Sequence, residues 1–131
     1  MSQQNVELNR RGFEAFNERD LDGVLAALDE DVELFPILAA MEGGYNGHDG
    51  VRRWWSGLLG GFPDIRVEVL EVRDLGEVTI AVVRVRGHGA ESDTPFDATV
   101  WQVHQWRHGK CFRWHAYSSE SEALEAVGLP E

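Results

Sequence analysis

Three stretches in the first half of the chain carry apolar residues at helical spacing. Val6, Phe13 and Phe16 recur on one side while Glu7 and Glu14 take the other, which predicts an amphipathic helix over residues 4–18. A second, short helix is predicted from residue 21 to about residue 29, with an aspartate at its start to cap it. The third, over residues 51–59, ends at a pair of glycines that a proline follows two residues later.

In the second half the apolar period changes from 3.6 towards 2, which is typical of strands. Residues 65–73 and 78–86 predict one hairpin, and residues 96–106 and 111–117 predict a second, joined by a turn at His108 and Gly109. A short strand over residues 32–35 stops at Pro36, residues 39–50 predict a loop, and Ser119 with Glu122 predicts the cap of a last helix. Helices first and a mostly antiparallel sheet afterwards predict an α+β fold, with residues 1–131 as a single domain.

The net charge and the cysteine content limit which partners, metals and disulfides we expect. The chain has 23 acidic and 12 basic residues, which gives a formal net charge of −11. We therefore expect neither nucleic acid nor an anionic membrane as a partner. No stretch approaches the roughly 20 apolar residues of a membrane span, and one cysteine, Cys111, supports neither a disulfide nor a zinc pair. We expect a cytoplasmic protein that holds no metal and no cofactor.

The second hairpin carries the side chains with the richest chemistry. A two-residue turn at positions 108 and 109 would place four cross-strand pairs on one face: Trp106 with Cys111, His104 with Arg113, Gln102 with His115, and Val100 with Tyr117. The opposite face would then carry Trp101, Phe112 and Trp114. Two interpretations are open: the aromatic face is the core and the polar face meets water, or the polar face lines a cavity and the aromatic face meets another subunit.

In the second interpretation the polar face could support acid–base catalysis. A guanidinium opposite His104 would disfavour its protonated form, so the neutral imidazole could act as a base. Arg113 would stabilise an enolate or a carboxylate, and His115 or Tyr117 would donate a hydrogen bond to the same oxygen. Of the acids near the first strand, we expect Glu33 to alternate outward and Glu42 to lie in a solvated loop.

Short motifs stand at residues 17–20, 28–32, 45–51, 108–110 and 122–124. Their order resembles the SnoaL-like polyketide cyclase family, which belongs to the nuclear transport factor 2-like, or ketosteroid isomerase-like, superfamily. The resemblance covers residues 4–128. It implies a cone in which a strongly curved sheet wraps over the helices, with a mostly apolar cavity between them, and a homodimer formed through the outer sheet face. It also implies that Arg113 and His115 point into the cavity and that Phe16, Phe35, Tyr45 and Trp54 supply apolar wall.

The chain departs from the catalytic patterns of that superfamily. Phe35 stands where a ketosteroid isomerase has its general-base aspartate, and Gly12 stands where it has a tyrosine. The expected function is therefore a small-molecule pocket, with possible acid–base chemistry of the cyclase, isomerase or dehydratase kind on a largely apolar carbonyl- or carboxylate-bearing compound. The alternatives are a ligand-binding or accessory domain without catalysis, and a protein-interaction domain that uses the aromatic sheet face.

Overall fold

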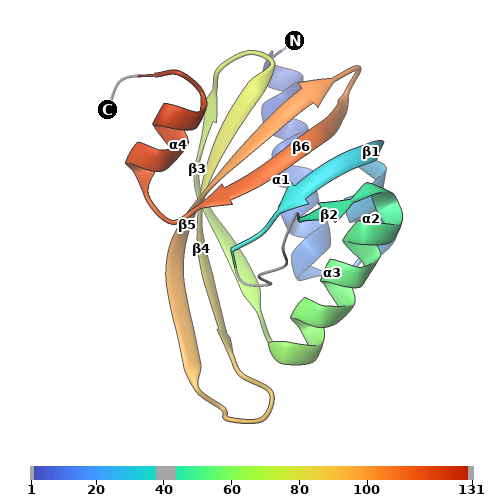
Figure 1. Cartoon of the computed structure of the whole chain (residues 1–131), viewed down its shortest axis with the longest axis vertical. Coiled ribbons are helices and arrows are strands. Elements are labelled where there is room, and N and C mark those ends of the chain that lie inside the picture. The colour runs from blue at the N-terminus through green and yellow to red at the C-terminus, as the bar shows by residue number, and fades with distance from the viewer. Residues whose placement is uncertain (1, 38–43, 130–131) are drawn as a thin grey trace.

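The structure, a computed structural model, describes residues 2–37 and 44–129 and has a mixed α+β fold (Figure 1). Within these described residues there are four helices and six strands, and the first two elements are helices. They are α1 (Ser2–Asn17), α2 (Leu21–Ala26), β1 (Leu28–Phe35), β2 (Tyr45–Asn46), α3 (Gly47–Gly61), β3 (Arg66–Asp74), β4 (Val78–His88), β5 (Pro95–Arg107), β6 (Lys110–Tyr117) and α4 (Glu120–Ala126).

All six strands form one curved sheet in the order β2-β1-β6-β5-β4-β3. The pairing of β1 with β6 is parallel and the other pairings are antiparallel. Helices α1, α2 and α3 lie on one side of the sheet, here called the inner face, and α4 lies on the other, the outer face (Figure 1). The main core lies on the inner side, and a small second cluster around Ile80, Val103 and Ala123 packs beneath α4.

Most predicted elements are confirmed, with differences at their ends. The predicted second helix stops at Ala26, because the next residues join the sheet: Cys111 N–H donates to the Ala27 carbonyl at 2.9 Å, and Leu28 pairs with Cys111. Helix α3 begins at Gly47, inside the predicted loop. Residues 39–43 of that loop, Glu42 among them, lie outside the described residues.

The predicted register of the second hairpin is wrong beyond its first two pairs. His108 and Gly109 have φ values of 53° and 75°, as a two-residue hairpin turn requires, and Trp106 pairs with Cys111 as predicted. The register then shifts, so that Gln105 pairs with Arg113 and Phe112 is an extra residue on β6. Such a bulge moves every later side chain of its strand to the opposite face.

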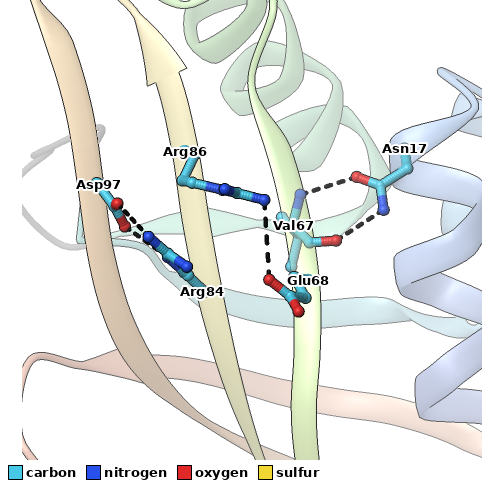
Figure 2. Close-up of polar contacts among 6 residues, drawn as sticks. All are labelled: Asn17, Val67, Glu68, Arg84, Arg86 and Asp97. Carbon is cyan, nitrogen blue, oxygen red and sulfur yellow. Dashed lines mark hydrogen bonds and ion pairs between the residues drawn. The ribbon is translucent and has the colours of Figure 1, made fainter.

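The side chain of Asn17 fastens the end of α1 to β3 (Figure 2). Its amide nitrogen donates to the Val67 carbonyl at 2.7 Å, and its oxygen accepts from the Val67 N–H at 2.9 Å. Figure 2 also shows a polar part of the outer face, where Arg84 binds both carboxylate oxygens of Asp97. The helix is thereby held over the sheet at one end, and the cavity lies between them.

Candidate functional site

A cavity of about 90 Å³ lies between the helices and the inner face of the sheet. Its wall is apolar and aromatic except for a few polar side chains, and none of the described residues that line it is charged. The lining residues are Leu8, Asn9, Gly12, Phe13, Phe16, Val24, Ala27, Leu28, Leu34, Pro36, Ile37, Trp54, Leu58, Ile65, Val67, Val85, Val100, Gln102, His104, Trp106, Cys111, Trp114 and Ala116.

One stripe of α1 forms a wall of the cavity. Gly12 and Phe13 lie three and four residues after Asn9, and Phe16 lies four and three residues after them, so the four share one helical face. A Cβ atom added at Gly12 would have no neighbour within 4 Å. Since glycine inside a helix costs about 1 kcal/mol relative to alanine, Gly12 weakens α1 while leaving this space open.

Four side chains from α1, β4 and β5 form a buried hydrogen-bonded chain at the edge of the cavity. The Trp106 indole donates to the Thr79 hydroxyl at 3.0 Å, and that hydroxyl donates to Asn9 Oδ1 at 2.6 Å. Asn9 Nδ2 lies 3.5 Å from Nδ1 of His104. Thr79 and His104 are cross-strand neighbours, so the β4–β5 register brings this chain together.

Aromatic rings enclose His104. It stacks between Trp106 and Trp114, at centroid distances of 6.1 and 5.4 Å, and meets Phe13 edge-on at 6.0 Å. This burial lowers the pKa of His104 from 6.5 to about 3, so the imidazole is neutral near pH 7. The cause differs from the predicted one, because Arg113 is on the opposite sheet face and has no part in the shift.

Two further polar residues line the cavity, Gln102 and Cys111. The indole of Trp114 donates to Gln102 Oε1 at 2.8 Å. Burial raises the pKa of the Cys111 thiol to about 12, which keeps it protonated and unreactive near neutral pH. Of the titratable side chains in the described lining, His104 and Cys111 therefore both remain uncharged.

Of the residues predicted for the cavity, four are in its lining: Phe16, Trp54, Gln102 and His104. Tyr45 is buried in the core but is outside the lining. Phe35 pairs with His115 in the β1–β6 ladder and stacks on its ring at 4.8 Å, also outside the lining.

The bulge at Phe112 places Arg113, His115 and Tyr117 on the outer face, which corrects the predicted sidedness of β6. Arg113 lies 3.6 Å from Glu33, whose predicted outward orientation is confirmed, and the His115 and Tyr117 rings stack at 4.3 Å. Burial, and secondly the charge of Arg113, lower the pKa of His115, and burial raises that of Tyr117. The predicted outward position of Trp114 is wrong for the same reason: it is 8% exposed and lines the cavity.

The sequence reasoning missed Asn9, Thr79, Cys111 and the inward position of Trp114. A signal for Asn9 was present, because it lies four and seven residues before Phe13 and Phe16 on the apolar stripe of α1. Thr79 and Cys111 gave no such signal, because a hydroxyl or thiol in an apolar strand is also compatible with an ordinary core.

The described residues include neither a cluster of metal-ligand side chains nor a membrane-spanning helix. Within residues 2–37 and 44–129, no three His, Cys, Asp or Glu side chains are grouped so that they could hold a metal ion. None of the helices described there is long and apolar enough to span a bilayer.

Comparison with known proteins identifies the family. The family model described as a SnoaL-like domain matches residues 9–114, and the chain belongs to this family. No curated protein matches the chain.

Solved structures share the fold at low sequence identity. An NTF2-like protein of unknown function from Burkholderia pseudomallei K96243 superimposes with a TM-score of 0.81 at 22% identity, covering 95% of this chain and 98% of its own. A putative SnoaL-like polyketide cyclase from Jannaschia sp. CCS1 gives 0.77 at 17%, covering 98% and 94%. A hypothetical protein with a ketosteroid isomerase-like fold from Catenulispora acidiphila DSM 44928, in complex with trimethylamine, gives 0.77 at 16%, covering 95% and 94%. At these identities the similarity establishes the fold alone.

Proposed function

We propose that this protein binds a small, largely apolar molecule in the cavity between α1, α3 and the sheet. The observation that carries the proposal is the composition of the wall, which is apolar and aromatic with a few polar groups gathered around His104. Ligand sites in proteins have this combination, in which apolar surface supplies affinity and a few polar groups orient the ligand.

Binding fits the described groups better than acid–base catalysis does. An imidazole whose pKa is about 3 is a weak base at pH 7, and a thiol whose pKa is about 12 is a weak nucleophile. His104 is therefore proposed as a hydrogen-bonding group for the ligand and not as the general base.

Cyclase, isomerase or dehydratase chemistry is the second candidate. It is favoured by the position of Gln102 and His104, two residues apart on the inner face of β5, where both could polarise one ligand oxygen. Proton exchange at the methyl group of acetophenone in heavy water, followed by NMR, distinguishes the two. A binding protein leaves the exchange rate unchanged, whereas an enzyme accelerates it and loses the acceleration in His104→Phe.

Filling the cavity tests the binding proposal. Gly12→Leu places a side chain in the open space beside Phe13 and should abolish binding of cumene, an apolar one-ring probe. Gly57→Leu is the matched control, because Gly57 is also helical and has no neighbour within 4 Å of an added Cβ, but it is exposed on α3 and outside the lining. Cumene that binds equally well to wild type and to Gly12→Leu would contradict the proposal.

The proposal also includes a homodimer through the outer face, as the family resemblance implies. Support comes from the stack of Phe35, His115 and Tyr117, which leaves aromatic surface partly exposed on that face. Light scattering should give about twice the chain mass of 14.7 kDa, and Tyr117→Glu should give the monomer mass. A wild-type protein that remains monomeric at high concentration would contradict this part of the proposal.

A further inference from the structure

Two indole N–H groups and one short hydroxyl–amide contact set the direction of the hydrogen bonds at the polar end of the cavity. An indole nitrogen donates and never accepts, so the Thr79 hydroxyl must accept from Trp106. That hydroxyl donates to Asn9 Oδ1 at 2.6 Å, a distance typical of an O–H donor and short for an amide N–H donor. Asn9 consequently presents its Nδ2, which is a donor, to His104.

This direction sets the tautomer of His104. Nδ1 faces an amide donor at 3.5 Å and so is the unprotonated nitrogen, which leaves the ring proton of the neutral imidazole on Nε2. Burial lowers the pKa of the ring and a hydrogen bond with the Gln102 backbone raises it; the net low value agrees with a single ring proton. His104 therefore meets a ligand as an N–H donor.

Gln102, like His104, offers a hydrogen-bond donor to the cavity. The Trp114 indole donates to Gln102 Oε1 at 2.8 Å. The amide nitrogen of Gln102 has no hydrogen-bond partner among the described residues, so it is the group that can bind a ligand. Asn9 is the one side-chain partner of His104 among the described residues. Among the side-chain nitrogens and oxygens of the described residues, His115 Nδ1 is the one that is fully buried without a partner. Neither His104 Nε2 nor Gln102 Nε2 is among these unpartnered buried atoms, and both residues line the cavity.

From these contacts we infer that the cavity selects an uncharged ligand which presents a hydrogen-bond acceptor, such as a carbonyl oxygen, to the N–H groups of His104 and Gln102. The inference rests on the proposed function and narrows its ligand class, because it excludes carboxylates. None of the described lining residues carries a positive charge that could compensate a buried anion, and the net charge of −11 opposes its approach. A ligand that presents only hydrocarbon to the two donors would leave them unpaired.

Three probes of nearly the same shape test this inference: acetophenone, cumene and benzoate. Their dissociation constants are measured by NMR titration of the wild-type protein. We expect acetophenone to bind about tenfold more tightly than cumene, which corresponds to about 1.4 kcal/mol, and benzoate to bind at least 100-fold more weakly than acetophenone. Acetophenone binding no better than cumene, or benzoate binding as well as acetophenone, would overturn the inference while leaving the pocket in place. If none of the three binds, the proposed function fails, and this inference with it.

A variant and a spectroscopic measurement test the role of His104 directly. His104→Phe removes one donor and should reduce the preference for acetophenone over cumene at least threefold. His115→Phe, a matched exchange on the outer face, should leave that preference unchanged. Nitrogen-15 spectra of the wild-type imidazoles need neither a ligand nor a variant: we expect the proton of His104 on Nε2, and a proton on Nδ1 would overturn the inference.

Discussion

His104 lies opposite Trp114 across the β5–β6 hairpin, and their rings stack at a centroid distance of 5.4 Å with an interplanar angle of 28°. This pairing exists because Phe112 is an extra residue on β6, which turns Trp114 to the inner face. The indole of Trp114 then covers the imidazole and donates to Gln102. One bulge thus creates both the dry surroundings of His104 and the donor polarity of Gln102.

The protonation of His104 gives a pH dependence of stability. Its pKa is about 3 in the folded protein against 6.5 ordinarily, so the unfolded chain binds a proton between these values that the folded one does not. The contribution of the neutral imidazole to the free energy of unfolding is fully present above pH 6.5. It is lost as the pH falls towards 3, at about 1.4 kcal/mol per pH unit.

Urea unfolding of wild type and His104→Phe measures this effect, since the other titrating groups are common to both. Between pH 6.5 and 5.0 we expect wild type to lose about 2 kcal/mol more than the variant. Parallel pH profiles would show that His104 takes up its proton equally in both states, contrary to its burial.

Cys111 should be unreactive in the folded protein. Its side chain is 1% exposed, and burial raises its pKa to about 12. At pH 8 we expect Ellman's reagent to modify no thiol in the native protein and the single cysteine in guanidinium chloride. Rapid modification without denaturant would mean that this part of β6 does not face the interior.

The side chain of Asn17 should contribute to the free energy of unfolding through its two hydrogen bonds to Val67. Asn17→Ala removes both hydrogen bonds to Val67 and should lower the free energy of unfolding by about 2 kcal/mol. Asn5→Ala is the matched control on the same helix, because Asn5 makes one such bond, to the Gly76 carbonyl at 3.0 Å, and should cost less. Equal losses in the two variants would indicate that the contact with Val67 does not fasten the helix.

Local patterns in the sequence predicted most of the fold. The spacing of Val6, Phe13 and Phe16 located α1, and the turn at His108 and Gly109 located the second hairpin, because both depend on residues close together in the chain. The parallel pairing of β1 with β6 depends on residues about 80 positions apart, such as Leu28 and Cys111, and no local pattern encodes it.

The candidate site was predicted only in part, for the same reason. Gln102 and His104 lie in the cavity lining, whereas Arg113 and His115 lie on the outer face, because the predicted register omitted the bulge. The residues of the turn do not indicate that the register shifts by one residue further along the strand. The apolar alternation of Trp114 and Ala116 was consistent with the observed inner face, and it favoured the interpretation in which the aromatic face is the core.

The five tryptophans allow the most direct test of where a ligand binds. Trp54, Trp106 and Trp114 line the cavity, whereas Trp55 and Trp101 do not. In nitrogen-15 spectra of the indole N–H groups, titration with acetophenone should shift the three lining signals and leave the other two in place. Shifts confined to Trp55 or Trp101, or no shift at all, would contradict a ligand site between the helices and the inner face of the sheet.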